Sequence, residues 1–194
     1  MLAQQDIDTD QIVPARFMAT IDRAGMGDAL FHDWRFGENA PSGGHHLDQI
    51  DRKAHQILVA GHNFGCGSSR EHAAWALFAF GIRAIVSTGF ADIFASNAAQ
   101  IGILTIVVDS AIHDRLLAHS GSEVLINLEV NELSAAFLQA PESFAVDPFT
   151  RTCLLEGRDP VGWLINAIGE AGGCKSHSNL PVADLGQLFA VPSA

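Results

Sequence analysis

The chain has 194 residues, of which 48% are hydrophobic, so it is long and apolar enough to bury one substantial core. Its formal charge of −11 and its 11 scattered Lys and Arg residues argue against nucleic-acid binding, which needs clustered cations. The three cysteines are few and widely spaced, which argues against a disulfide framework and favours a reducing compartment. No apolar run reaches the roughly 18 residues that cross a bilayer, and the N-terminus lacks the regions of a secretion signal. We expect a soluble, cytoplasmic protein that binds neither membrane nor nucleic acid.

Three aspartates alternate near the N-terminus, at Asp6, Asp8 and Asp10. In an extended segment they would point to one face, because successive side chains of a strand alternate. The simpler interpretation is a solvated edge, and the alternative is a cluster of acceptors at a site. Pro14 interrupts regular strand pairing there.

Residues 26–36 have apolar side chains at helical spacing and predict a short amphipathic helix, with the apolar positions at Leu30, Phe31 and Trp34. This stripe is more typical of a core or a partner contact than of a cofactor site. Residues 37–44 have the composition of a loop, and we expect His45 and His46 to form its solvated edge.

The most informative stretch runs from residue 61 to residue 72, between an apolar run at 57–60 and an alanine-rich segment at 73–80. This order predicts a strand, a tight turn and a helix. Its three glycines, Gly61, Gly65 and Gly67, allow sharp turning and close approach of the backbone to a ligand.

Ser68 and Glu71 have the spacing of a capping box, which predicts that the helix starts there. The unpaired N–H groups of a helix start, with Arg70 beside them, would suit a carboxylate or a phosphate. The alternative is a capped helix behind a purely structural turn. Arg70 replaces the third glycine of a dinucleotide fingerprint, and the Gly-Lys-Ser/Thr of a nucleotide P-loop is missing.

Beyond this stretch, apolar runs at 84–87 and 103–108 predict buried strands, and residues 91–100 and 111–119 predict helices. Strands that alternate with helices indicate an α/β fold with a parallel sheet. Right-handed crossovers would then place the turn at the carboxyl end of its strand, where open α/β sheets bind ligands.

After residue 122 the pattern changes, and residues 123–130 and 144–147 predict short antiparallel strands. Residues 149–156 and 161–168 predict helices. We expect residues 1–168 to form a single domain and the Gly/Ser-rich residues 169–194 to form a mobile tail.

Several chemistries compete for the central stretch. A metal site could use four side chains whose spacing lacks a Cys-x-x-Cys or His-x-x-x-His pair: His55, His62, Cys66 and His72. The three dispersed cysteines cannot hold a four-cysteine cluster by themselves, so we predict no metal in this chain.

Cys66 could be a nucleophile, because a thiolate near a helix N-terminus is stabilised. Ser68 or Ser69 lacks the Gly-x-Ser-x-Gly elbow of a hydrolase, but a hydroxyl beside an arginine can transfer protons next to a bound carboxylate.

Residues 8–17 and 63–72, with 89–94, Asn97, 147–149 and 153–157, closely resemble the small subunits of 3-isopropylmalate dehydratases. These are free-standing versions of the swivelling domain of the aconitase superfamily. The resemblance covers nearly the whole chain in the right order. It implies a swivelling β/β/α domain, with a mostly parallel core sheet flanked by helices and with additional short antiparallel strands.

The resemblance also implies an activity, the isomerisation of 2-isopropylmalate to 3-isopropylmalate by dehydration and rehydration in leucine biosynthesis. In that family a large subunit carries the four-iron–four-sulfur cluster, so this chain would be active only as part of a hetero-oligomer. The substrate would be a small dicarboxylate, and related subunits act on other alkylmalates or on citraconate. The competing classes are a non-catalytic module that binds carboxylate or phosphate and a Ser or Cys hydrolase that works alone.

By match to the family motifs, Ser68 would be the base that takes the proton alpha to a carboxylate. Arg70 would clamp a substrate carboxylate, and Ser69 with nearby amides would hydrogen-bond it. Asp10 matches an acidic position near the site.

Phe17 and Met18 fall in the loop that resembles the family's selector for the substrate side chain, where an apolar lining suits an isopropyl group. Gly65 and Gly67 would shape the anion-binding turn. For Cys66 the resemblance implies a structural role.

Overall fold

The computed structural model describes residues 1–19 and 24–157. The helix predicted at 161–168 and the tail predicted at 169–194 lie outside the described residues. The described residues form a parallel sheet, an antiparallel sheet, the helices around them and an N-terminal segment.

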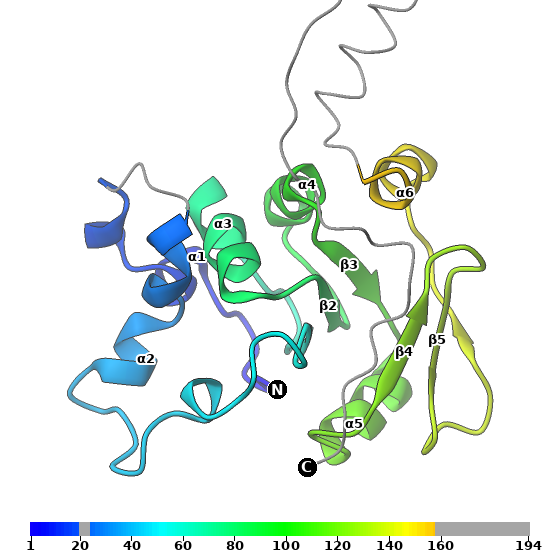
Figure 1. Ribbon diagram of the computed structural model, residues 1–194, viewed down its shortest axis with the longest axis horizontal. Helices are drawn as coiled ribbons and strands as arrows, with labels where there is room; N and C mark the ends of the chain where they lie inside the picture. Colours follow the sequence, from blue (N-terminus) through cyan, green and yellow to red (C-terminus); the bar gives the residue numbers. More distant parts are fainter. Residues whose placement is uncertain (20–23, 158–194) are drawn as a thin grey trace, which may run out of the picture.

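A parallel three-stranded sheet lies at the centre, with the order β1-β2-β3 (Figure 1). Its strands are β1 (Ile57–Val59), β2 (Ala84–Ser87) and β3 (Leu104–Val107). Each forms where a short run of β-branched and leucine residues can be buried, and Ala84–Ser87 is buried at every position. The three strands predicted from apolar runs are confirmed.

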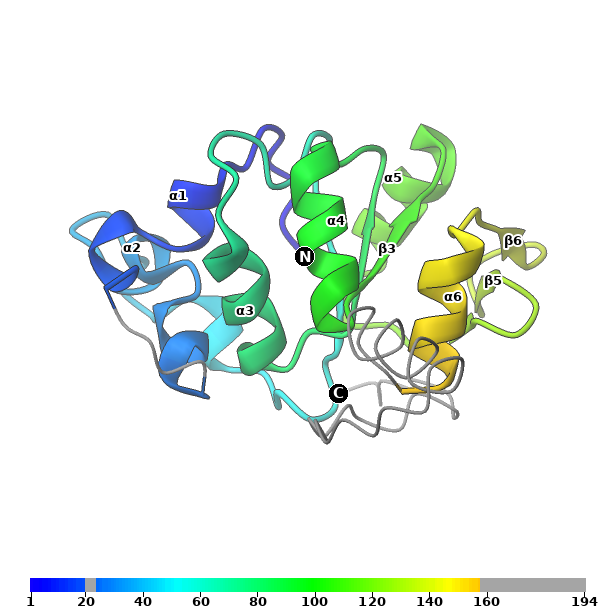
Figure 2. The ribbon, with the colours of Figure 1, turned by 90° about the horizontal axis from the view of Figure 1, so that it is seen from above.

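Three helices connect and follow these strands: α3 (Glu71–Phe80), α4 (Asp92–Ile101) and α5 (Ser110–Ala118). Figure 2 shows α3 and α4 side by side over one face of the sheet, and α5 lies on the other face. The helices predicted after the second and third strands are confirmed within two residues at each end.

The alternation of side chains along the strands separates two cores. Leu58 and Ile85 point toward α3 and α4, whereas Val59 and Val86 point toward α5 and the second sheet. Burial on both faces explains why β1 and β2 read as continuous apolar runs.

The second sheet is antiparallel, with the order β4-β5-β6. It consists of β4 (Val124–Asn127), β5 (Glu132–Ala135) and β6 (Glu142–Ser143), and α6 (Pro148–Leu155) follows it. The sequence predicted a strand at 144–147, which is wrong, because β6 ends at Ser143 and Asp147 caps α6 by accepting from Thr150 N. The α/β fold with a parallel sheet and added antiparallel strands is confirmed.

The N-terminal segment is mostly short helices: α1 (Thr9–Ile12), η1 (Ala15–Phe17), η2 (Ala24–Ala29), α2 (His32–Phe36) and η3 (His46–Asp48). The continuous helix predicted at 26–36 is wrong, because Phe31 adopts a left-handed conformation with φ of 47° between η2 and α2. The Phe31 N–H donates to Ile12 O at 2.7 Å, and its buried ring stacks on Trp34. Tertiary contacts therefore override the local helical pattern, while the predicted apolar stripe does face the core.

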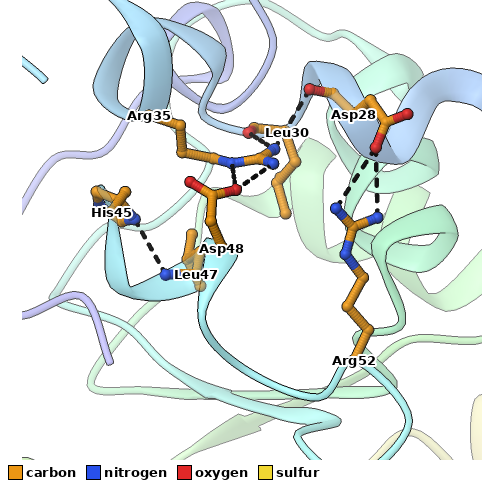
Figure 3. A network of polar contacts seen from close by, with 7 residues as sticks. All are labelled: Asp28, Leu30, Arg35, His45, Leu47, Asp48 and Arg52. Carbon is orange, nitrogen blue, oxygen red and sulfur yellow. Dashed lines mark hydrogen bonds and ion pairs between the residues drawn. The ribbon is translucent and has the colours of Figure 1, made fainter. Parts of the chain in front are cut away.

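A buried arginine holds this segment together (Figure 3). The Arg35 side chain is 3% exposed and donates to Asp48 Oδ1 from Nε at 2.8 Å and from Nη2 at 2.5 Å. Its Nη1 donates to the carbonyls of Leu30 and Asp28, at 2.9 and 3.3 Å. His45, predicted to be solvated, is instead buried and accepts from Leu47 N at 3.2 Å, whereas His46 is exposed as expected.

Candidate functional site

The turn that follows β1 is clamped between two other segments. On one side, the His62 carbonyl accepts a hydrogen bond from Asp6 N at 2.9 Å, and Gly65 N donates to Ile7 O at 2.8 Å. On the other side Phe64 N donates to Gly89 O at 3.2 Å, and Phe64 O accepts from Ala91 N at 3.1 Å. The turn therefore lies at the carboxyl end of the parallel strands, as the alternation of strands and helices predicted.

Gly65 is required by both conformation and space. Its φ is +78°, and a Cβ added there would lie 2.2 Å from Cγ of Phe94. The Phe94 ring in turn meets the buried Phe64 ring edge-on at 5.2 Å. Gly67 has φ of +88° but room for a Cβ, which would lie in ordinary van der Waals contact, 3.4 Å from Cβ of Asp8.

The helix after the turn begins later than the capping box predicted. α3 starts at Glu71, and Arg70 is the N-cap residue without a side-chain cap hydrogen bond. Ser68 and Ser69 are exposed, and within residues 1–19 and 24–157 neither hydroxyl takes part in a hydrogen bond. Both hydroxyls are therefore available to a ligand, which a capping role would have prevented.

Arg70 is tied to the N-terminal segment through Asp10. Its Nη1 donates to Asp10 Oδ1, and the side chains are 16% and 54% exposed, respectively. A guanidinium carries five N–H donors, and this is the one hydrogen bond of the Arg70 side chain among the described residues. The remaining donors can bind an anion at the mouth of the turn.

The three alternating aspartates do not share one extended face, so that expectation is wrong. Asp8 is the N-cap of α1 and accepts from Gln11 N at 2.7 Å, which starts a helix where the alternation suggested an extended segment. Asp6 accepts from Asn63 Nδ2 at 2.8 Å. Each carboxylate has its own partner, and Asp10 is the one that reaches Arg70.

Cys66 is a poor candidate for a nucleophile. Burial raises the pKa of its thiol, and the carboxylates of Asp8 and Asp6 raise that pKa further. A raised pKa disfavours the thiolate, which is the reactive form. The raised pKa therefore argues against the alternative of an activated cysteine.

The four side chains considered for a metal do not converge. His62 pairs with Thr88 Oγ1 at 3.2 Å, and the His72 ring packs beside Trp75. In the part of the chain that the structure describes, no three His, Cys, Asp or Glu side chains form a metal-binding group. None of the helices described there is long and apolar enough to span a bilayer.

Phe17 and Met18 lie at the end of η1 in the N-terminal segment. The Phe17 ring lies 4.8 Å from the His32 ring and 4.9 Å from the Arg16 guanidinium carbon, and Met18 is exposed. Arg16 is held by Asp33, whose carboxyl pKa it lowers. Over residues 1–19 and 24–157, no hydrogen bond or ring contact joins Phe17 or Met18 to the turn.

Sequence reasoning missed two side chains that hold the turn. Ser87, fully buried at the end of β2, places Oγ 2.8 Å from Gly61 O and 2.9 Å from Gly89 O. Thr9, also buried, donates from Oγ1 to Ser68 O at 3.0 Å. The sequence offered two signals for these supports: Ser87 is a polar residue at the end of an apolar run, and Thr9 stands between two aspartates.

The N-terminal part of the chain resembles a known protein family. A family model of the aconitase C-terminal domain matches residues 1–111, more than half of the chain. The chain therefore belongs to the aconitase C-terminal domain family.

Two curated relatives are similar over most of their length. The 3-isopropylmalate dehydratase small subunit of Anaeromyxobacter dehalogenans (strain 2CP-1) is 44% identical over 166 residues, which cover 85% of this chain and 86% of the relative. That of Herpetosiphon aurantiacus is 46% identical over 164 residues, which cover 82% and 80%. Among solved structures, 3-isopropylmalate dehydratase (LeuD) from Methanocaldococcus jannaschii matches with a TM-score of 0.66 and 27% identity, over 87% of this chain and 92% of that chain. Within its family the chain thus groups with the 3-isopropylmalate dehydratase small subunits.

Proposed function

We propose that this chain is the small subunit of a 3-isopropylmalate dehydratase, a hydro-lyase of leucine biosynthesis that works in the cytoplasm. It would interconvert 2-isopropylmalate and 3-isopropylmalate together with a large subunit. The observation that carries the proposal is the turn at the carboxyl end of β1. It presents an exposed Ser68 hydroxyl that has no hydrogen bond within the described residues, two positions before Arg70, whose guanidinium uses one N–H donor on those residues. Its similarity to small subunits over 85% of the chain supports the same assignment.

The reaction moves one hydroxyl and one proton between neighbouring carbons. In the proposed mechanism, Ser68 Oγ as an alkoxide takes a proton from carbon 3 of 2-isopropylmalate, while the bond between carbon 2 and its hydroxyl breaks. An alkene diacid results, and the removed proton is carried by the Ser68 hydroxyl. In the second half Ser68 returns that proton to carbon 2 and a hydroxide adds to carbon 3, so atoms and charges balance.

Ionising a serine hydroxyl is costly, and positive potential reduces that cost. Two sources follow Ser68 closely along the chain: the guanidinium of Arg70, two residues on, and the first N–H groups of α3, which have no acceptor within the helix. Ser69 and these amides would hydrogen-bond the same carboxylate that Arg70 clamps. The turn would therefore bind the substrate through the group that also activates its base.

Asp10 would act on the substrate through Arg70. It binds one edge of the guanidinium in this structure, which leaves the remaining donors directed to a ligand. Gly65 and Gly67, both with positive φ, give the turn its shape. Phe17 and Met18 are proposed to line the space for the isopropyl group once the large subunit is bound.

The large subunit would carry a four-iron–four-sulfur cluster, which supplies the Lewis acid for the leaving hydroxide. The described residues of this chain offer no group of three ligands for such a cluster, so this chain's share of the work is binding, orientation and proton transfer.

The test is reconstitution. The purified chain alone, and the chain mixed with a cluster-loaded dehydratase large subunit, are assayed with 2-isopropylmalate and with citraconate. We expect no turnover by the chain alone and turnover of 2-isopropylmalate by the mixture. Turnover of citraconate alone would assign the chain to a related hydro-lyase. Activity of the isolated chain with no iron present would contradict the proposal.

A further inference from the structure

The backbone that carries Ser68 has little local support of its own. Gly67 before it adopts φ of +88°, and both Ser68 and Ser69 are exposed. The Ser68 carbonyl accepts from Arg70 N at 2.7 Å, a bond within the turn itself. A flexible glycine and two exposed serines cannot fix the direction of a reactive hydroxyl, so the constraint must come from outside the turn.

Thr9 supplies that constraint from a position 59 residues away in the sequence. Its backbone N–H donates to Cys66 O at 2.9 Å, and its Oγ1–H donates to Ser68 O at 3.0 Å. The two bonds hold the Cys66–Gly67 peptide and the Ser68–Ser69 peptide, which enclose Gly67 and Ser68. Thr9 is 1% exposed, so water does not compete for its hydroxyl.

The helix α1 in turn fixes Thr9. Asp8 forms a full capping box with Gln11, with Asp8 Oδ1 accepting from Gln11 N at 2.7 Å and Asp8 N donating to Gln11 Oε1 at 2.9 Å. Thr9 is the first residue of this helix, where its N–H has no helical acceptor and is free to bind the turn. A four-residue helix is too short to be stable by itself, so its cap and its contacts with the turn hold it in place.

We propose that Thr9 is a positioning residue for the reaction, because its side-chain hydroxyl fixes the peptide of Ser68 and so the direction of the Ser68 hydroxyl. This inference rests on the proposed function, in which Ser68 transfers the proton. Reacting atoms must approach to within about 3–3.5 Å, and a displacement of about 1 Å can cost on the order of 100-fold in rate. Loss of the Thr9 hydroxyl therefore lowers kcat. It leaves KM nearly unchanged, because the Arg70–Asp10 pair does not use that hydroxyl.

The experiment compares three variants of the reconstituted enzyme. Thr9→Val removes the hydroxyl and keeps the shape, Thr9→Ser keeps the hydroxyl and removes the methyl group, and Thr152→Val is the matched control. Thr152 Oγ1 also donates to a backbone carbonyl, that of Pro148 at 2.9 Å, but it does so in α6. We expect Thr9→Val to lower kcat by roughly 10- to 100-fold with KM within about threefold, and Thr9→Ser and Thr152→Val to keep kcat near that of the unmodified enzyme.

A kcat for Thr9→Val within about threefold of the unmodified enzyme would overturn the proposal, as would equal losses for Val and Ser, which indicate a packing role. If Thr9→Val does not fold, the pair Thr9→Ala and Thr9→Ser gives the same comparison, and equal kcat values would overturn the proposal. The proposed function is judged separately, from turnover by the unmodified mixture. Full turnover there with an unaffected Thr9→Val enzyme would remove this inference alone.

Discussion

Two arginine–aspartate pairs in this chain are chemically alike and differ in what surrounds them. Arg35 pairs with Asp48 beneath the N-terminal helices, and its Nε, Nη1 and Nη2 atoms all donate, to a carboxylate and two carbonyls (Figure 3). Arg70 pairs with Asp10 at the turn through one nitrogen, and the exposed carboxylate belongs to a four-residue helix.

The comparison separates a structural arginine from one that is available to a ligand. A guanidinium whose N–H donors are bonded to its own chain is rigid and has no free donor for a substrate. One with unused donors beside an exposed hydroxyl can bind a planar carboxylate through two parallel hydrogen bonds. Stability is therefore expected to depend on Arg35, and activity on Arg70.

Arg70→Met gives the largest expected effect. Loss of charged hydrogen bonds to the substrate, each worth about 1.5–3 kcal/mol, should lower kcat/KM of the reconstituted enzyme by about 100-fold or more. The free energy of unfolding should change by less than about 1 kcal/mol, because the Asp10 pair is partly exposed. Steady-state kinetics and urea unfolding of the isolated chain measure both quantities. A stability loss as large as that of Arg35→Met would remove the distinction between the two arginines.

Arg35→Met should produce the opposite result. It leaves Asp48 without its cation and two carbonyls without a donor, and we expect a loss of about 3 kcal/mol, the low end of the range for a broken buried pair. The kcat of the folded fraction should stay near that of the unmodified enzyme. The matched control is Arg52→Met, whose exposed pair with Asp28 at 3.4 Å should cost less than about 1 kcal/mol. Equal losses for the two variants would contradict the structural role of Arg35.

Gly65→Ala tests whether the shape of the turn is set by packing as well as by backbone conformation. Its matched control is Gly121→Ala, because Gly121 has a similar φ of +85° with nothing within 4 Å of an added Cβ. Both variants pay about 1–2 kcal/mol for a left-handed alanine. Gly65→Ala should cost about 2 kcal/mol more, because its methyl group would meet Phe94. Equal thermal shifts would show that the turn adjusts freely around Phe94.

Cys66→Ala should have the smallest effect. Burial and the nearby carboxylates raise the pKa of the Cys66 thiol, which disfavours the thiolate that a nucleophile needs. We expect kcat/KM within about threefold of the unmodified enzyme, and alkylation of Cys66 by iodoacetamide that is slower in the folded chain than in urea. Loss of most activity on this change would restore a chemical role for Cys66.

The sequence predicted the parts of the fold whose signal is local. Apolar runs marked β1, β2 and β3 because most of their positions are buried, and the segments that alternate with these strands marked α4 and α5. The late start of α3 was not predictable, because Thr9 binds the Ser68 carbonyl across 59 residues of sequence and holds Ser68 outside the helix.

The site residues divide in the same way. Glycine spacing and Arg70 suggested an anion-binding turn, and family resemblance suggested the roles of Ser68 and Asp10. The pairing of Asp10 with Arg70 joins two segments that no local pattern connects. The buried supports Thr9 and Ser87 act through backbone carbonyls, which any sequence contains, so their partners leave no residue-specific signal.

The most direct test of the central claim is Ser68→Ala in the reconstituted enzyme, with the exposed Ser143→Ala in β6 as its control. We predict that Ser68→Ala lowers kcat by at least about 1,000-fold, as expected for loss of the proton-transfer group, while assembly with the large subunit and thermal unfolding stay unchanged. Ser143→Ala should keep full activity. Near-normal kcat for Ser68→Ala would contradict the account and leave the turn as a carboxylate-binding element without a part in the chemistry.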